Sequence, residues 1–381
     1  MKTDKNCRIQ TLAVHAGHDV DAATGAVTEG IHLSTTYERD PDGGYERGYM
    51  YGRNSNPNRF GLETALSALD GGAVAAAFSS GVAAAAAIFQ GLMPGDHVIA
   101  PIDCYYGTAR LLKQLFAKWN VSASFVDMTR LDTVRSNLTP DTKIIWIETP
   151  SNPLLRCVDI VALVELAHSH GARAVADNTF ASPIVQRPLE LGCDVVTYST
   201  TKFLGGRGDV LGGVVVSKDD DEHFAQVRAA QAFGGAVPSP FDCWLLMRSL
   251  PTLPYRMQAH CDNAQRLAEF LHSHPKVSAV HYPGLEGDSS HAIAKQQMSH
   301  FGGMLSFEME GGKPAAMAVA AKVQLFTRAT SFGGVESLIE HHASMSGPDS
   351  TVPEALLRIS AGLEHIDDLI DDISNALADS V

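Results

Sequence analysis

The stretch "DVVTYSTTKFLGG", residues 194–206, joins a β-prone run to small hydroxyl residues, a lysine and paired glycines. The run 195–198 is β-branched or aromatic, which favours a strand, and Ser199, Thr201 and Lys202 follow it. A desolvated ammonium at the end of a buried strand is costly unless a partner stabilises it. We therefore expect Lys202 either to have a covalent or anionic partner or to point to water.

Similar apolar runs recur along the chain and predict a mostly parallel sheet. They are "AVAAAFSS" (73–80), "DHVIAPID" (96–103), "KIIWIETP" (143–150), "ARAVADNT" (172–179) and "VLGGVVVS" (210–217). Segments between several of them, such as "DIVALVELAHSHG" (159–171), have helical spacing and a glycine stop. This alternation indicates βαβ units in an α/β fold, with helices on both faces of the sheet. In such sheets ligands gather at the carboxyl ends of the strands.

The flanking regions differ from this alternation and predict further parts. Residues 1–60 are rich in Gly, Asn, Pro and Tyr toward their end and have little periodicity, which indicates an extended arm. From residue 251 a Pro-interrupted segment, "SLPTLPYRM" (249–257), leads to helical and strand patterns. We expect a larger domain over 61–250 and a smaller C-terminal α/β domain over 251–381.

Composition excludes several classes of protein. The 381 residues, 45% of them hydrophobic, can bury a core large enough for two domains, whereas a net charge of −14 argues against a nucleic-acid binder. The six cysteines show no C-x-x-C pair, so neither a disulfide framework nor a metal site is predicted. No apolar run resembles a signal peptide or a membrane span, and we expect a cytoplasmic protein.

The predicted strand ends carry several polar and reactive groups. "SSGVAAAAAIF" (79–89) places a Ser-Gly turn before a helix, which is either a tight turn or a phosphate cradle. Asp177 could cap a helix or face a buried cation, and Lys202 could point to water or form a Schiff base. A tyrosine pair, Tyr105 and Tyr106, follows another strand. Together these groups indicate pyridoxal 5′-phosphate, which needs a Schiff-base lysine, a carboxylate for its ring nitrogen, a phosphate cradle and a stacking ring.

Beyond these features, the sequence resembles the Cys/Met-metabolism family of fold type I pyridoxal-phosphate enzymes, and within it the cystathionine γ-synthase and γ-lyase group. The resemblance extends from "TLAVHAG" (11–17) to "GLEHIDDLIDDI" (362–373). It implies a fold type I transferase fold, and homotetramers built from catalytic dimers. It also implies a small amino-acid substrate and an arm that reaches the neighbouring subunit.

The resemblance implies a role for each matching residue. Lys202 of "STTK" is the Schiff-base lysine, Asp177 of "DNTFASP" pairs with the ring nitrogen, and Tyr106 of "DCYYGTARLL" stacks on the ring and relays a proton. Glu148 is expected to orient the cofactor's surroundings. The other cofactor-binding residues are Gly81, Val82, Ser199 and Thr201, with Tyr51 and Arg53 acting on the neighbour's phosphate. The substrate carboxylate is bound by Arg358, with Asn152 and Ser331 in support.

The exact reaction stays open at the level of sequence. Thr330 stands where relatives carry glutamate, Arg328 lies two residues earlier, and "HHASMSG" (341–347) and "KFLGGRGD" (202–209) depart from the usual motifs. Arg110 and Thr108 favour cystathionine chemistry at the γ-carbon, by elimination or replacement. The alternatives are a methionine γ-lyase or an O-acyl-homoserine sulfhydrylase, and more distantly an aminotransferase or a non-catalytic cofactor-binding protein.

Overall fold

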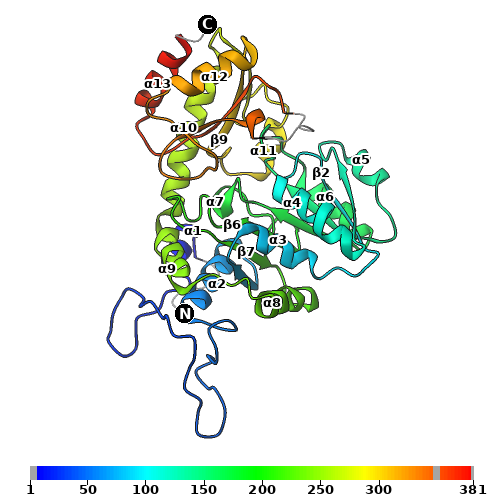
Figure 1. Ribbon diagram of the computed structural model, residues 1–381, viewed down its shortest axis with the longest axis vertical. Coiled ribbons are helices and arrows are strands. Elements are labelled where there is room, and N and C mark those ends of the chain that lie inside the picture. The colour runs from blue at the N-terminus through cyan, green and yellow to red at the C-terminus, as the bar shows by residue number, and fades with distance from the viewer. Residues whose placement is uncertain (1–6, 346–351, 379–381) are drawn as a thin grey trace.

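The computed structural model describes residues 7–345 and 352–378, in which two β-sheets are flanked by helices (Figure 1). The larger sheet has the order β1-β7-β6-β5-β4-β2-β3. Its strands are β1 (Val74–Phe78), β2 (His97–Pro101), β3 (Ser122–Val126), β4 (Thr142–Glu148), β5 (Arg173–Asp177), β6 (Val195–Ser199) and β7 (Gly213–Ser217). Only β7 runs antiparallel to its neighbours, β1 and β6, so the predicted mostly parallel α/β sheet is confirmed.

Helices cover both faces of this sheet because its strands are apolar on both sides. Alternate residues, such as Ile145 and Ile147 against Ile144 and Trp146, belong to two separate buried clusters. The helices are α1 (Ile9–His15), α2 (Pro57–Asp70), α3 (Gly81–Phe89), α4 (Tyr106–Arg110), α5 (Leu131–Ser136), α6 (Ile160–Ser169), α7 (Ser182–Val185), α8 (Glu222–Gly234) and α9 (Pro240–Ser249). Short π and 3-10 turns lie at Leu111–Leu115, Phe116–Trp119 and Leu250–Thr252.

The second sheet lies in the C-terminal part of the chain, with the order β10-β11-β12-β9-β8. Its strands are β8 (Val277–His281), β9 (Met304–Met309), β10 (Thr327–Arg328), β11 (Leu338–His341) and β12 (Leu356–Ser360). The helices are α10 (Leu253–His272), α11 (His291–Gln297), α12 (Gly312–Lys322) and α13 (Ile366–Ala378), with a 3-10 turn at His342–Ser344. This smaller α/β unit has its own buried cluster. The exact domain boundaries stay a prediction.

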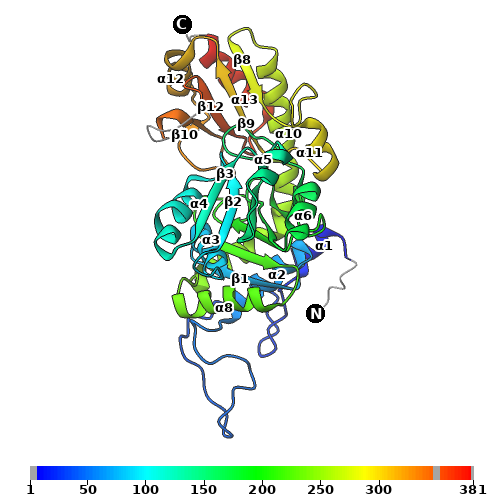
Figure 2. The ribbon, with the colours of Figure 1, turned by 90° about the vertical axis from the view of Figure 1, so that its right-hand side faces the viewer.

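The segment between α1 and α2 projects from the body as two loops, one of which reaches farther from the sheets than the other (Figures 1 and 2). Thr36 and Tyr51 form an antiparallel bridge that joins its two sides. Its exposed apolar side chains include Val27, Leu33 and Met50. Separately, no helix among the described residues has the length and apolar character to cross a membrane.

Candidate active site

Lys202 lies in the turn after β6, and its amine faces the C-terminal domain. Lys202 Nζ donates to Ser331 Oγ at 2.5 Å and lies 4.9 Å from the centre of the Phe332 ring. Ser331 has a φ of +84°, and a Cβ on Gly333 would come within 2.6 Å of Phe203 N. The glycine therefore lets this loop pack directly on the lysine turn. Burial and, to a smaller extent, the charge of Arg358 lower the pKa of Lys202, Glu340 raises it, and the net result is a pKa of about 8.

Arg358, on β12, brings together three of the predicted substrate residues. Its Nη1 donates to Asn152 Oδ1 at 2.8 Å, and its Nη2 donates to the Ser331 carbonyl at 3.2 Å and to Glu340 Oε2 at 2.5 Å. Arg358 and Glu340 are also register partners on β12 and β11. The guanidinium has five N–H donors, and among the described residues these contacts leave one donor on Nε and one on Nη1 without a protein acceptor. A neutralising glutamate beside this arginine was not predicted from the sequence.

Asp177 and Glu148 form a pair of carboxyl groups at the carboxyl ends of β5 and β4, where they are register partners. Burial raises the pKa of both, and the neighbouring Asp177 raises the pKa of Glu148 further. Thr179 donates to Asp177 Oδ1 from its backbone N at 3.1 Å and from Oγ1 at 2.6 Å, which counters the rise in the pKa of Asp177. An edge of Asp177 remains accessible. The negative charge of the pair therefore favours Asp177, the residue predicted to meet a cation.

The Ser-Gly turn forms the start of α3 and packs on the end of β6. Ser80 Oγ accepts from Ala83 N at 3.1 Å, as an N-cap residue does. A Cβ on Gly81 would lie 2.7 Å from Ser199 Cβ, so only glycine allows this approach. Within the described part of the chain, no hydrogen-bond partner meets the N–H groups of Gly81 and Val82. These donors at a helix N-terminus fit a phosphate.

The two predicted phosphate hydroxyls have different surroundings. Ser199 adjoins Asp177 through Thr179, whose Oγ1 accepts from Ser199 N at 2.9 Å. Thr201 Oγ1 instead accepts from Gly212 N at 3.1 Å and donates to Gly212 O at 3.3 Å. Ser199 thus lies beside the cradle, whereas the hydroxyl of Thr201 bonds to the backbone that enters β7.

The two tyrosines of the pair, Tyr105 and Tyr106, have different surroundings. Tyr106 is 61% exposed and its ring packs on Arg110, with 4.5 Å from Cζ to the ring centre. Tyr105 is 45% exposed, its backbone N donates to Glu148 Oε2 at 2.7 Å, and burial, followed by Asp177 and Glu148, raises its pKa. Tyr105 is therefore the ring of the pair that shares the electrostatic surroundings of Asp177. The role predicted for Tyr106 stays a prediction.

Tyr51 and Arg53 lie apart from these groups in their own chain. Arg53 Nη1 donates to the carbonyl of Ala232 on α8, and its guanidinium lies 5.7 Å from the centre of the Tyr51 ring. Neither residue has a recorded contact with Lys202 or Asp177 among the described residues. Their predicted role toward a neighbouring subunit stays a prediction.

Together the residues present fit pyridoxal phosphate. A half-buried amine, an accessible carboxylate and free helix N–H groups are presented by adjoining loops around the strand ends of one sheet. A family model described as Cys/Met metabolism PLP-dependent enzyme matches residues 10–378. The chain belongs to this family. It is therefore a pyridoxal-phosphate-dependent enzyme, and the predicted cofactor is confirmed.

Similar proteins in the family differ in the reaction that their names describe. A cystathionine gamma-synthase of Mycobacterium tuberculosis (strain H37Rv) is 49% identical over 375 residues, with 96% of each chain covered. A cystathionine beta-lyase of Coxiella burnetii is 44% identical, covering 98% of this chain and 99% of its own. A solved structure described as a cystathione gamma lyase from Micromonospora echinospora has a TM-score of 0.94 and 43% identity, covering 98% and 99%. These matches confirm the predicted fold type I architecture.

Two residues of the site, Thr179 and Glu340, were not predicted from the sequence. Thr179 could have been found, because an Asp two residues before a Thr commonly accepts local hydrogen bonds. Glu340 had no such signal, since its contact with Arg358 depends on strand pairing. Among the departures noted in the sequence, Arg328 and Thr330 are exposed. The last two residues of "HHASMSG", 346 and 347, lie outside the described residues.

Proposed function

We propose that this enzyme acts at the γ-carbon of a sulfur amino acid or homoserine ester, as cystathionine γ-synthases and γ-lyases do. The γ-synthase relative and the γ-lyase structure support this reaction type. Elimination and replacement use one set of residues, so the same site serves either outcome.

The observation that carries the proposal is that one residue, Ser331, bonds to both Lys202 and Arg358. Ser331 accepts from Lys202 through its hydroxyl and from Arg358 through its carbonyl. An amino acid whose carboxylate is bound by Arg358 therefore has its α-carbon close to Lys202 Nζ. Arginine has five donors and can bond to Asn152, Ser331 and Glu340 and still bind a carboxylate, whereas lysine has only three donors.

The residues then have complementary roles in proton transfer. Bound pyridoxal phosphate supplies an electron sink for the negative charge formed when a proton leaves the α-carbon. Lys202, with its lowered pKa, would take that proton, return it to the bound cofactor and, neutral again, take a second proton from the β-carbon, which activates the γ-substituent for departure. Asp177 holds a positive charge at the ring nitrogen. We assign the stacking ring and proton relay to the tyrosine pair, and the position of Tyr105 beside Asp177 and Glu148 favours Tyr105 over Tyr106.

We further propose a homotetramer of catalytic dimers in which the arm presents Tyr51 and Arg53 to a neighbour's phosphate. The exposed arm supports this arrangement, since several of its apolar side chains, such as Val27, Leu33 and Met50, are exposed in a single chain. We place the enzyme in the cytoplasm, where its six free cysteines would stay reduced.

An assay with product identification tests the reaction. The enzyme is incubated with an O-acyl-homoserine and cysteine, and separately with cystathionine, methionine and homocysteine. We expect cystathionine from the first mixture, or a four-carbon 2-oxo acid with equal ammonia from the others. Pyruvate and homocysteine from cystathionine would instead identify cleavage at the β-carbon. Turnover that requires a keto-acid amine acceptor would identify an aminotransferase, and the absence of all products would contradict an enzymatic role.

A further inference from the structure

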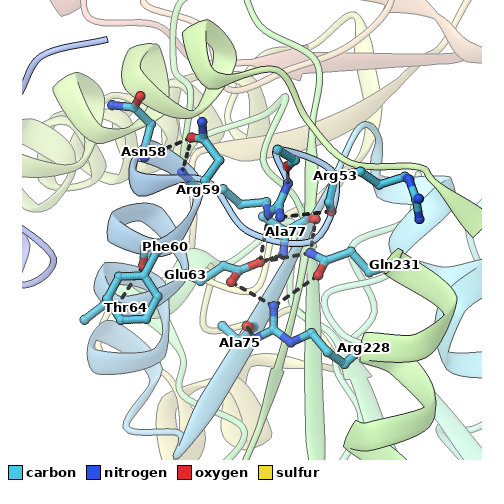
Figure 3. A network of polar contacts seen from close by, with 12 residues as sticks. Arg53, Asn58, Arg59, Phe60, Glu63, Thr64, Ala75, Ala77, Arg228 and Gln231 are labelled. Atoms are coloured by element: carbon cyan, nitrogen blue, oxygen red, sulfur yellow. Dashed lines mark hydrogen bonds and ion pairs between the residues drawn. The ribbon is translucent and has the colours of Figure 1, made fainter. Parts of the chain in front are cut away.

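A buried polar network joins the base of the arm to the larger sheet (Figure 3). Its central residues are Arg59 and Glu63, which lie four positions apart on α2 and are only 3% and 7% exposed. Arg59 Nε lies 3.9 Å from Glu63 Oε1. Burying two charges is costly unless each has further partners, so the remaining contacts of this pair are informative.

Arg59 holds the backbone on both sides of Arg53. Its Nη1 donates to the carbonyl of Gly52 at 3.0 Å, and its Nη2 donates to the carbonyl of Arg53 at 3.1 Å (Figure 3). These carbonyls belong to the two peptide groups that bound Arg53. A planar guanidinium thus fixes the direction in which Arg53 leaves the chain.

Glu63 in turn holds the network to the sheet and to α8. Its Oε1 accepts from Ala77 N at 2.8 Å and from Gln231 Nε2 at 2.9 Å, and its Oε2 accepts from Arg228 Nη1 at 2.8 Å. Ala77 is on β1, the strand that leads to Gly81. The arm's returning side is therefore tied through Glu63 to β1 and α8 of the larger domain.

The first residues of α2 hold the outgoing side of the arm in the same way. Asn56 Nδ2 donates to the His32 carbonyl at 2.8 Å, and Asn58 Nδ2 donates to the Gly30 carbonyl at 2.8 Å. Both sides of the arm are thus fixed at one helix N-terminus, and of Asn56, Asn58 and Arg59 only Arg59 bonds to the carbonyls of residues 52 and 53 in the described part of the chain.

We propose that Arg59, held by Glu63, is a positioning residue for the neighbouring subunit's active site. It presets the backbone of residues 52–53 so that Arg53 is presented to the cofactor phosphate bound by a second copy of this chain. The inference rests on the proposed function, in which the arm serves a neighbour. A network that only supported its own chain would affect the site of that chain instead.

The test uses Arg59→Lys, which keeps the charge beside Glu63 but lacks the fork that binds two carbonyls. We expect the dissociation constant of pyridoxal phosphate to rise about tenfold, as for the loss of a hydrogen-bonded fork, while kcat at saturating cofactor stays near that of the unmodified enzyme. Arg266→Gln, an exposed arginine on α10 paired with Asp367, is the matched control and should change neither quantity. Unchanged cofactor affinity in Arg59→Lys would overturn the proposal.

Hybrid dimers, purified through a different tag on each chain, decide whether Arg59 acts on its own site or on its neighbour's. In the first hybrid, an Arg59→Lys chain is paired with a Lys202→Ala chain. Its one working site receives an unmodified arm, so we expect normal cofactor affinity. In the second hybrid, an Arg59→Lys/Lys202→Ala chain is paired with an unmodified chain. Its working site receives the altered arm, and we expect the tenfold weakening.

The reverse pattern, with weak binding only in the first hybrid, would overturn the proposal, because Arg59 would then act within its own chain. Glu63→Gln keeps an acceptor for Ala77 N and should reproduce the expected pattern with a smaller change; normal affinity in both of its hybrids would overturn the role of Glu63. The same two hybrids made with Arg53→Ala test the shared site by itself. Weak binding confined to the first Arg53→Ala hybrid would show that the arm does not serve a neighbour, a failure of the proposed function distinct from a failure of Arg59 alone.

Discussion

The amine of Lys202 illustrates how burial prepares a single residue for its task. A pKa of about 8 means that a sizeable share of the amine is neutral near physiological pH, whereas an exposed lysine would be almost fully protonated. The β-prone run and the hydroxyl residues after it indicated a lysine at the end of a buried strand, which would need a partner or access to water. Its partners, Ser331 and Glu340, belong to another domain, so local sequence could not reveal what tunes its pKa.

Replacing Glu340 tests this tuning without any substrate. Because Glu340 raises the pKa of Lys202 and also neutralises Arg358, which lowers it, Glu340→Gln should lower that pKa. The rate at which the apoprotein attaches pyridoxal phosphate should rise with pH with a midpoint near 8 in the unmodified protein, and at lower pH in the variant. We expect several-fold faster attachment at pH 7. The exposed Glu336→Gln is the control, and an unmoved midpoint in Glu340→Gln would contradict this account.

The two carboxyl groups at the strand ends should respond differently to neutral replacements. Burial and Asp177 raise the pKa of Glu148 well above its ordinary value, so Glu148→Gln preserves the protonated state and should retain kcat/KM within about threefold. Asp177→Asn removes the charge that the ring nitrogen requires and should lower kcat/KM by about 10²-fold or more. Steady-state kinetics of both variants check this, and equal losses would contradict the assignment of the charge to Asp177.

At the scale of elements, six of the seven strands of the larger sheet follow from apolar runs in the sequence. The strand that was missed, β3, is an edge strand whose first residues are small, polar and partly exposed. An edge strand that is not buried on both faces needs fewer apolar residues, so its sequence lacks the continuous apolar run that marks the other strands. The polar strand ends were predictable together with the strands, because each apolar run stops where the strand leaves the core.

Helix α2 and strand β6 are joined by a buried contact that the mechanism does not use. Tyr198 OH donates to Asp70 Oδ1 at 2.5 Å, and the other oxygen of Asp70 is buried with no recorded partner in the described structure. Burial raises the pKa of Asp70 to about 7. The folded state therefore keeps this proton up to about pH 7, while the unfolded chain releases it near 3.8.

It follows that Asp70 makes the free energy of unfolding decrease as pH rises from about 4 to about 7, because the folded state binds more protons. Between pH 6 and 8 the decrease from this group amounts to about 1 kcal/mol. Asp70→Asn should remove that part of the pH dependence, as measured by denaturant midpoints at the two pH values. The exposed Asp219→Asn should leave it unchanged, and an unaltered pH dependence in Asp70→Asn would contradict the raised pKa.

At the scale of the whole molecule, the active site is assembled from two sheets. Lys202 and Ser331 are 129 positions apart and still form a direct hydrogen bond. The sequence alone predicted both residues through a family resemblance, but their contact depends on how the two domains dock. The same limit applies to the arm, whose composition predicts an extended segment but not the network at Arg59 that holds it.

Sharing of the site between chains can be tested by complementation. Arg53→Ala alone should weaken cofactor affinity by about 1–3 kcal/mol, for a lost charge-assisted contact, and Lys202→Ala alone should be inactive. When the two variants exchange subunits, one site in each hybrid combines Lys202 from the first chain with Arg53 from the second. At limiting cofactor, activity should rise above that of either parent. A mixture that exchanges subunits, as verified by mass, and stays at the parental level would contradict a shared site.

The central claim is that Lys202, at the carboxyl edge of the larger sheet, carries the cofactor of this enzyme. Reducing the cofactor-loaded protein with borohydride makes the bond between lysine and cofactor permanent, and peptide mass mapping then locates it. We predict one phosphopyridoxyl group for each chain, on the peptide that contains Lys202, and none on the same peptide of Lys202→Ala. A group on a different lysine, or no group on a protein that has bound the cofactor, would contradict the claim.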